Sequence, residues 1–221
     1  GDGSFTGAKI FSSEYDIAVI GIPGTIDNDI NGTDFTLGYD TALNTVVDAI
    51  DKIRDTANSH DRLFLIEVMG RDAGDIALNS GIAAGAEEIL IPEENLGMDR
   101  LVESLHKSRI AGKTSSIVVV AEGDQIGKNI SELAANLERD LPQYEVKVTV
   151  LGHIQRGGSP SCYDRVLASR LGVGAIDALL EGDSNVMVGV SHSKIVRVPF
   201  ETAIDFKKTI DTDLIRVADI I

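Results

Sequence analysis

Two carboxylates, Asp27 and Asp29, stand two positions apart in the segment PGTIDND at 23–29. Residues two apart on an extended loop face the same side, so both side chains can reach one ligand. One carboxylate can then remove a proton from an attacking hydroxyl while the other holds Mg²⁺. Thr25 adds a hydroxyl beside that base. The structural alternative stays open, because Asp-Asn-Asp segments also form turns in which side chains bond to nearby backbone.

Anion binding is the second chemistry that the residue types indicate. Arg71 and Arg156 each follow a predicted strand in a glycine-containing segment, MGRDAG at 69–74 and GHIQRGGSP at 152–160. A guanidinium can hold a phosphate through two parallel hydrogen bonds, although a lone arginine is more often part of a surface salt bridge. His153 adds a donor close to Arg156.

Two weaker signals complete the polar set. Glu122 follows a predicted strand in AEG at 121–123, and its carboxylate can accept hydrogen bonds from the hydroxyls of a polyol such as a sugar. The opening GDGS at 1–4 is as compatible with an ordinary turn as with a phosphate cradle. We expect a loop there, from which Asp2 can share the metal.

The charge balance restricts the partners. With 20 basic and 35 acidic residues the net charge is −15, and such a surface repels nucleic acid and anionic membranes. An anionic ligand therefore requires local arginines, which the segments above supply. No apolar run approaches the roughly 18 residues of a membrane span. The lone Cys162 excludes an intrachain disulfide and a multi-cysteine zinc site. These features predict a cytoplasmic protein without nucleic-acid or membrane partners.

A scaffold must bring these polar segments to one edge. Short β-branched runs alternate with longer amphipathic stretches, which predicts parallel sheets with helices on both faces. In such open sheets, ligands bind beyond the carboxyl ends of the strands, where four of the polar segments lie. The expected strands are 17–22, 63–68, 89–91, 117–121, 146–151 and a hairpin of 186–190 with 195–198; the expected helices are 39–59, 75–84, 98–111, 130–141, 163–180 and 214–221.

The segments PGTIDND, MGRDAGDIAL, AEG and LGHIQRGGSP, in this order and spacing, resemble the bacterial ATP-dependent 6-phosphofructokinases. The resemblance runs from residue 1 to the C-terminus, and PGTIDND together with HIQRGGSP carries most of its specificity. It implies transfer of the γ-phosphate of ATP to the 1-hydroxyl of fructose 6-phosphate, a glycolytic reaction that uses Mg²⁺. It also implies a cytoplasmic homotetramer that responds to effectors.

The resemblance assigns a role to individual residues. Asp27 matches the general base, Thr25 a contact to the transferring phosphoryl group, and Arg71 an electrostatic clamp on it. The magnesium carboxylates it implies are Asp2 and Asp29, and the nucleotide contacts are Asp2, Gly3 and Ser4. The fructose 6-phosphate contacts it implies are Thr25, Asp27, Arg62, Met69, Gly70, Arg71, Glu122, Lys147, His153 and Arg156. Arg62 matches a residue that reaches the sugar phosphate of a neighbouring subunit.

A separate effector site for ADP or phosphoenolpyruvate is also implied, at Arg54, Gly85, Glu87 and Lys113. From the sequence alone, Arg54 and Arg62 are better explained as solvated charges at a helix end, where they compensate the helix dipole. Ala111 stands where the family usually has an arginine, so we expect weak regulation. Lys147 likewise stands in place of an arginine and lacks its bidentate fork, which predicts weaker fructose 6-phosphate binding.

The implied fold is two doubly wound, Rossmann-like three-layer lobes, the phosphofructokinase fold, with its N-terminal part missing. The larger nucleotide lobe is expected at 1–38 and 156–208, and the smaller fructose 6-phosphate lobe at 39–155 and 209–221. Because the family's N-terminal third is absent, we expect the first lobe to be incomplete and to bind ATP weakly.

The donor and the class of protein each have an alternative. In diphosphate-using relatives Asp stands in place of Gly3 and Lys in place of Gly24, whereas two glycines leave room for a nucleotide and favour ATP. A non-catalytic binding or regulatory subunit is the alternative from another class. Asp27, Asp29 and Arg71 argue against it, because binding a sugar phosphate needs no base.

Overall fold

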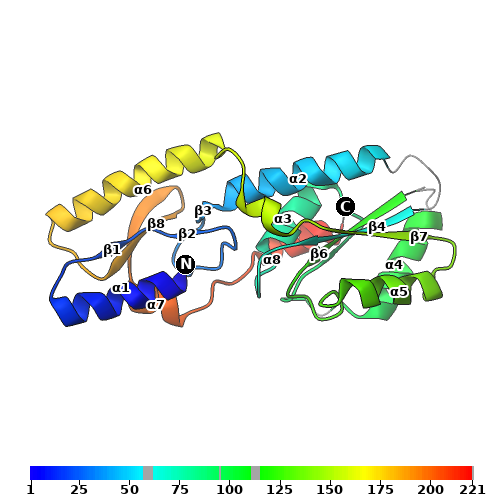
Figure 1. Ribbon diagram of the computed structural model, residues 1–221, viewed down its shortest axis with the longest axis horizontal. Coiled ribbons are helices and arrows are strands. Elements are labelled where there is room, and N and C mark those ends of the chain that lie inside the picture. Colours follow the sequence, from blue (N-terminus) through cyan, green and yellow to red (C-terminus); the bar gives the residue numbers. More distant parts are fainter. Residues whose placement is uncertain (57–61, 95, 111–114, 221) are drawn as a thin grey trace. The chain divides into compact units, whose positions relative to one another are not determined.

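The structure is a computed structural model, and it describes residues 1–56, 62–94, 96–110 and 115–220. The chain forms two compact units, whose helices and strands are labelled in Figure 1. None of the described helices is long and apolar enough to cross a membrane. Unit 1 consists of Gly1–Thr41 and Ser159–Thr209, and unit 2 of Ala42–Gly158 and Ile210–Ile221.

Unit 2 is built on a four-stranded parallel sheet. The strand order is β5 (Glu88–Leu90), β6 (Ser115–Ala121), β4 (Arg62–Val68) and β7 (Glu145–Val150). The central strands β4 and β6 pair along their whole lengths, and the apolar run of β6 is buried. Such continuous apolar runs are typical of parallel strands covered on both faces. The helices of this unit are the Ala42–Thr56 part of α2 (Tyr39–Thr56), α3 (Asp75–Ala84), α4 (Met98–Ile110), α5 (Ile130–Asp140) and α8 (Thr212–Ala218).

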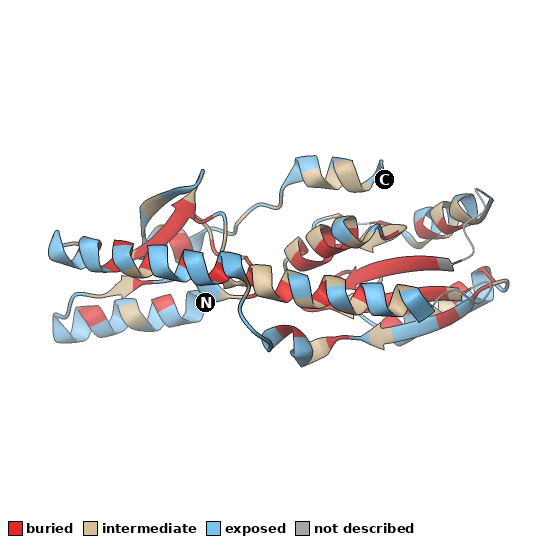
Figure 2. Cartoon of the chain, turned by 90° about the horizontal axis from the view of Figure 1, so that it is seen from above, coloured by how far each residue is buried: buried red, intermediate tan, exposed pale blue. Residues whose placement is uncertain are grey.

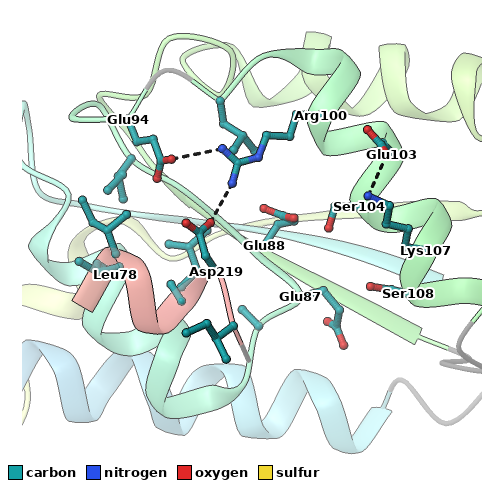
Figure 3. A pocket seen from close by; sticks show the side chains of 17 residues that line it. Leu78, Glu87, Glu88, Glu94, Arg100, Glu103, Ser104, Lys107, Ser108 and Asp219 are labelled. Atoms are coloured by element: carbon teal, nitrogen blue, oxygen red, sulfur yellow. Dashed lines mark hydrogen bonds and ion pairs between the residues drawn. The ribbon is translucent and has the colours of Figure 1, made fainter. Parts of the chain in front are cut away.

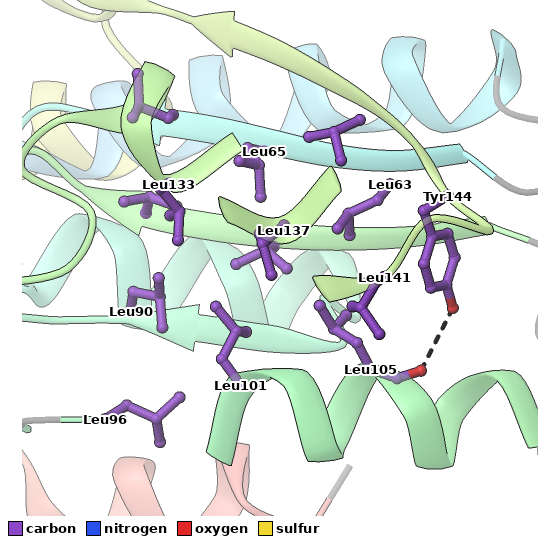
Figure 4. Packing of buried hydrophobic residues seen from close by; sticks show 14 residues of the cluster. Leu63, Leu65, Leu90, Leu96, Leu101, Leu105, Leu133, Leu137, Leu141 and Tyr144 are labelled. Atoms are coloured by element: carbon purple, nitrogen blue, oxygen red, sulfur yellow. Dashed lines mark hydrogen bonds between the residues drawn. The ribbon is translucent and has the colours of Figure 1, made fainter. Parts of the chain in front are cut away.

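One face of this sheet carries a large apolar core, drawn in Figure 4. Leu101 and Leu105 of α4 lie four residues apart on one helix face, as do Leu133 and Leu137 of α5. They pack with the strand residues of the same cluster, including Leu63, Leu65, Leu90, Val118 and Val120. Successive strand residues point to opposite faces, so the buried residues between them face the other layer of helices.

Unit 1 has a smaller sheet with strand order β1 (Ile20–Gly21), β8 (Val186–Ser191) and β9 (Lys194–Pro199). β1 runs parallel to β8, and β8 and β9 form the antiparallel hairpin expected from the sequence. Val188 and Val190 pack in one cluster with α6 (Cys162–Leu180), and Met187 packs in another with Phe5 and Phe200. Those last two residues belong to α1 (Asp2–Tyr15) and α7 (Phe200–Asp205), and their rings stack at 5.1 Å.

Most of the expected elements are confirmed to within one or two residues at each end. The strand expected at 17–22 is shorter, since only Ile20–Gly21 pairs with β8. The helix expected at 39–59 ends at Thr56, and its last residues lie outside the described part of the chain. The sequence did not predict α1, of which only Phe5 and Ser12 are buried. A helix whose faces are almost all exposed gives no amphipathic pattern. In Figure 2, buried residues occur both in strands and in several of the other helices.

Candidate functional site

The candidate residues fall into both units, and the first set lies between two short parallel strands of unit 1. These are β2 (Gly24–Thr25) and β3 (Leu37–Gly38). Asn28, only 3% exposed, closes the loop between them: its Oδ1 accepts a 3.0 Å hydrogen bond from the Thr36 backbone N–H. The Thr36 hydroxyl donates to the Thr25 carbonyl at 2.8 Å. Asn28 has φ 55°, a left-handed conformation that asparagine adopts more readily than most residues.

Asp27 and Thr25 lie together in this loop. The Asp27 backbone N–H donates to Thr25 Oγ1 at 3.2 Å, and Asp27 is 2% exposed. Asp29, two residues further on, is half-buried. The two carboxylates therefore have different environments, one shielded and one reaching the surface. Such a difference suits a division of roles between two acidic side chains.

Asp2, Gly3 and Ser4 do not form the loop expected from the sequence. They make the first turn of α1, with Gly1 as N-cap, and the Ser4 backbone N–H donates to the Gly1 carbonyl at 3.0 Å. The prediction was wrong because two glycines were taken as turn formers, although neither has a left-handed φ here. The amino group of Gly1 donates to the Gly24 carbonyl at 3.1 Å. The start of α1, with the exposed Asp2, therefore lies against β2.

In unit 2, the loops that follow β4, β6 and β7 are bonded to one another. Glu122 Oε1 accepts from the backbone N–H groups of Gly70, at 3.2 Å, and Arg71, at 2.8 Å. The side-chain oxygen Oε1 of Gln155 accepts from the Met69 backbone N–H at 3.2 Å, and Gln155 is 1% exposed. Two side chains, one on each neighbouring loop, thus fix the loop after β4.

Glycine permits a close approach of two of these loops. A side-chain carbon at Gly123 would lie 2.1 Å from the Arg71 carbonyl oxygen. Gly70 has φ 144° and Arg71 has φ 52°, so the backbone turns sharply at the end of β4. The Arg71 side chain is exposed at this turn.

The loop after β7 is a short 3₁₀ helix, η1 (Gly152–Arg156). Gln155 is buried within it, whereas His153 and Arg156 are exposed. Because β4 and β7 are neighbours in a parallel sheet, their carboxyl ends lie at one edge. The anion-binding candidates Arg71, His153 and Arg156 therefore belong to neighbouring loops at that edge.

Glu122 has a positioning role that the sequence did not predict. One of its oxygens is bonded to the backbone of the loop carrying Arg71. Burial, and next the negative charge of Glu122, raise the pKa of Glu67 on β4. This carboxylate therefore influences both the loop and the strand that leads into it.

Arg62 and Lys147 form a separate group around Glu145. Arg62 Nε lies 3.2 Å from one Glu145 oxygen and Lys147 Nζ lies 2.6 Å from the other. Hydrogen bonds from Lys147 and then Arg62 lower the pKa of Glu145. Arg62 stands at the start of the seven-residue β4, and Met69 follows its end. At about 3.3 Å per residue, Arg62 is thus roughly 20 Å from the acceptor loops of this chain.

Of the four residues assigned to an effector site, Arg54 and Gly85 lie together. The Arg54 guanidinium donates to the carbonyls of Ala84 and Gly85, the latter at 3.1 Å, at the end of α3. Glu87 accepts a 2.6 Å hydrogen bond from a backbone N–H of β6. Lys113 lies outside the described residues.

A cavity of about 330 Å³ lies in unit 2 and is lined by residues of β5, α4 and α8 (Figure 3). Arg100 bridges Glu94, at 3.4 Å, and Asp219, at 2.8 Å. Burial raises the pKa of Glu88 there, and the negative charges of Asp219 and Glu94 act in the same direction. Among the described effector candidates, Glu87 alone lines this cavity.

Two residues that fix the loops were missed from the sequence. Asn28 and Gln155 are buried amides whose hydrogen bonds hold the loops that carry the charged candidates. Both lie inside segments singled out for other residues, PGTIDND and HIQRGGSP. An uncharged amide inside a dense polar segment is the signal that was available, because it can donate and accept at once.

The chain matches the phosphofructokinase family model over residues 1–179. It belongs to that family. It is 56% identical over 217 residues to "ATP-dependent 6-phosphofructokinase 2" of Bacteroides thetaiotaomicron, which covers 98% of this chain and 66% of that protein. It is 54% identical over 221 residues to an ATP-dependent 6-phosphofructokinase of Listeria welshimeri, a match that covers 100% of this chain and 68% of that protein. The chain thus spans about two thirds of the length of these curated relatives.

Solved structures agree on the fold. A phosphofructokinase from Saccharomyces cerevisiae superposes with a TM-score of 0.86 at 36% identity, over 93% of this chain and 31% of that one. A pyrophosphate-dependent phosphofructokinase from Marinobacter aquaeolei gives a TM-score of 0.77 at 24% identity, over 96% of this chain and 59% of that one. This likeness supports the fold alone. The predicted α/β phosphofructokinase fold is confirmed.

Proposed function

We propose that this chain carries the phosphoryl-transfer residues of an ATP-dependent 6-phosphofructokinase. The reaction moves the γ-phosphate of ATP to the 1-hydroxyl of fructose 6-phosphate and yields fructose 1,6-bisphosphate and ADP. The observation that carries the proposal is the shielded Asp27, 2% exposed, in the loop directly after Thr25. The names of the bacterial relatives support the substrates.

In unit 1 the proposed task of Asp27 is to accept the proton of the attacking hydroxyl. Thr25 Oγ1, which takes a hydrogen bond from the Asp27 N–H, fixes the turn between the two residues. Asp2 and Asp29 would hold Mg²⁺, which when bound neutralises phosphate charge. No group of three or more metal-binding side chains gathers in the described parts of the chain. One or two carboxylates commonly bind Mg²⁺ together with substrate phosphates, and this is the role proposed for Asp2 and Asp29.

In unit 2 the proposed task is to bind the acceptor. Arg71, His153 and Arg156 supply donors for the sugar and its phosphate, and Arg71 balances charge on the transferred group. Glu122 retains a second oxygen for a sugar hydroxyl while its first holds the loop. Met69 and Gly70 supply the backbone of that loop. The loops then act by positioning and charge balance, which dominate phosphoryl transfer.

ATP is the proposed donor. A side-chain carbon at Gly3 or Gly24 would meet no protein atom within 4 Å, so packing does not require glycine at either position. Neither residue has a left-handed φ, so backbone conformation does not require it. The space beside both residues is then free for a ligand, which supports the larger nucleotide over diphosphate.

The assembly and regulation implied by the family are also proposals. Arg62 and Lys147 lie away from the acceptor loops of their own chain, which supports a role for Arg62 at the site of a neighbouring subunit in a homotetramer. Arg54, Gly85, Glu87 and Lys113 are proposed to bind ADP or phosphoenolpyruvate. We further propose a cytoplasmic location, in keeping with a glycolytic enzyme.

The test compares Asp27→Asn with Asp16→Asn. Asp16 is exposed at the end of α1 and has φ 53°, which asparagine tolerates, so it provides the same charge change in the same unit. Formation of fructose 1,6-bisphosphate is measured with ATP, and fructose 6-phosphate binding by calorimetry. A positioned base contributes about 10²–10⁴-fold, so Asp27→Asn should lower kcat by that factor while binding is retained.

Two outcomes would contradict the proposal. Equal turnover by Asp27→Asn and Asp16→Asn would show that Asp27 is not the base. A folded, unmodified chain that binds both ATP and fructose 6-phosphate and still forms no product would favour a non-catalytic binding subunit. A chain that binds fructose 6-phosphate but not ATP would instead match the weak ATP binding expected of an incomplete first lobe.

A further inference from the structure

Asp164 is a buried carboxylate of unit 1 to which the mechanism above gives no task. It lies in the first turn of α6 and is 5% exposed. Its Oδ1 accepts a 3.0 Å hydrogen bond from the Gly38 backbone N–H. Its Oδ2 accepts a 2.9 Å bond from the Thr41 N–H and another from the Thr41 hydroxyl. One carboxylate on α6 thus receives three donors from the end of β3 and the first turn of α2.

Neighbouring polar groups strengthen this attachment. Ser161, the N-cap of α6, donates from its backbone N–H to Thr41 Oγ1 at 3.0 Å. Its hydroxyl also bonds to the Asp40 carboxylate. A negative charge between two helix N-termini is favourable, because the free N–H groups there carry partial positive charge. The first turns of α2 and α6 are therefore tied together through Asp164 and Ser161.

The hydrogen bonds of Asp164 are connected to the candidate base, Asp27, through β3 and β2. Gly38, which donates to Asp164, is the register partner of Thr25 across β2 and β3. Thr25 Oγ1 in turn accepts from the Asp27 N–H. Gly38 has φ 99°, a conformation that glycine adopts at no steric cost. Because glycine is conformationally permissive, the hydrogen bond to Asp164 helps to hold Gly38 in this conformation. The connection from Asp27 to α6 is therefore short. It runs through the two-residue strands β2 and β3 and the hydrogen bond from Gly38 to Asp164.

We propose that Asp164 is a positioning residue for phosphoryl transfer. It holds Gly38, and through the β2–β3 pair it holds Thr25 and Asp27 at the position where the proton is accepted. In this role it contacts neither substrate nor metal. The predicted effect on turnover rests on the proposed function. The predicted effect on the base loop rests only on the hydrogen bonds of unit 1.

The variant that tests it is Asp164→Asn. An asparagine of the same shape has one accepting oxygen and an NH₂ group, so it cannot satisfy three donors. The matched control is Asp177→Asn, an exposed aspartate on the same helix, which makes the same charge change. Both are compared for kcat and for the KM of fructose 6-phosphate, with hydrogen exchange of the Asp27 and Gly38 amides measured by NMR.

The expected result is a split between the kinetic constants. A displacement near 1 Å at the reacting group can lower a rate about 100-fold, so kcat should fall by about tenfold to 100-fold. The KM of fructose 6-phosphate should stay within about twofold, because Arg71, His153 and Arg156, the proposed donors to the sugar and its phosphate, belong to unit 2. The Asp27 and Gly38 amides should exchange faster than in Asp177→Asn.

A second variant, Thr41→Val, covers the case in which Asp164→Asn does not fold. It removes one of the three donors to Asp164 and should give the same changes at smaller size. A folded variant with unchanged kcat, or one with unchanged exchange at Asp27, would overturn the proposal. If the unmodified chain binds ATP and fructose 6-phosphate but has no turnover, the proposed function fails, while the exchange data still decide whether Asp164 holds the loop.

Discussion

The two units hold their candidate residues in different ways. In unit 2 the acceptor loops follow strands of six or seven residues, β4, β6 and β7, whose ladder places the loop ends. In unit 1 the base loop lies between strands of only two residues, β2 and β3. Its shape depends on side-chain hydrogen bonds from Asn28, Thr36 and Asp164.

This difference predicts where each unit is sensitive. A loop that side-chain amides and hydroxyls hold should fail when one polar atom is removed, because no backbone ladder replaces it. A loop whose ends long strands hold, with Glu122 and Gln155 as further contacts, should be less sensitive to the loss of one polar atom. It should fail when a neighbouring backbone is pushed away. The substitutions that follow test each half of this statement.

The largest effect is expected for Asn28→Ala. The change leaves the buried Thr36 N–H without its acceptor, which costs about 1–3 kcal/mol. It also puts alanine at φ 55°, at a further cost of about 1–2 kcal/mol. The free energy of unfolding, measured with urea, should fall by about 2–5 kcal/mol, and turnover should be lost.

Asp16→Ala is the control, since it introduces the same left-handed alanine, φ 53°, at an exposed position. It should lose only the backbone part, about 1–2 kcal/mol. If both variants lose the same amount, the side chain of Asn28 does not hold the base loop, and the contrast between the units fails.

Gly123→Ala tests the other half. The added carbon would lie 2.1 Å from the Arg71 carbonyl oxygen, so the loop that carries Arg71 must move. We expect the dissociation constant of fructose 6-phosphate, measured by calorimetry, to rise about tenfold, or about 1.4 kcal/mol. The sheet of unit 2 should stay folded, because its large leucine core is untouched.

Gly97→Ala provides the comparison in the same unit, because a side-chain carbon there meets no atom within 4 Å. It should leave fructose 6-phosphate affinity unchanged. Equal affinity in the two variants would mean that the approach of the β6 loop to Arg71 does not matter for acceptor binding.

The same contrast explains what the sequence could predict. The strands and helices of unit 2 have long apolar patterns, so the buried run of β6 and the bounds of α4 and α5 were predicted nearly to the residue. In unit 1, α1 has almost no buried face, and β1 pairs over two residues only. Local patterns cannot reveal elements that are fixed by tertiary contacts rather than by periodicity.

The candidate site divides in a similar way. The charged residues Asp27, Arg71 and Arg156 were selected from their types and from their places after strands. The groups that hold them, Asn28, Gln155 and Asp164, were not selected, because their importance depends on burial and on partners many residues away. Their spacing from the loops they fix follows no local period.

The smallest effect is expected where a polar group in unit 2 opposes folding. Burial raises the pKa of Glu88, with Asp219 and Glu94 acting in the same direction, so the folded chain binds this proton more tightly than the unfolded chain does. The free energy of unfolding therefore falls as pH rises from the ordinary carboxyl pKa to the raised one, and the loss remains at neutral pH. Glu88→Gln, which cannot ionise, should raise the Tm at pH above this window and change it little below.

Glu103→Gln is the matched control, because a hydrogen bond from Lys107 lowers the pKa of this exposed carboxyl. Ionisation of Glu103 therefore adds to the free energy of unfolding instead of lowering it, so Glu103→Gln should not raise the Tm at neutral pH. Thermal unfolding of both variants on either side of the window separates the two cases. A lower Tm for Glu88→Gln at neutral pH would mean that the Ser104 hydrogen bond and the charge of Arg100, which favour the ionised form, outweigh burial. Glu88 would then help to hold its unit together electrostatically, as the polar residues of unit 1 hold theirs by hydrogen bonds.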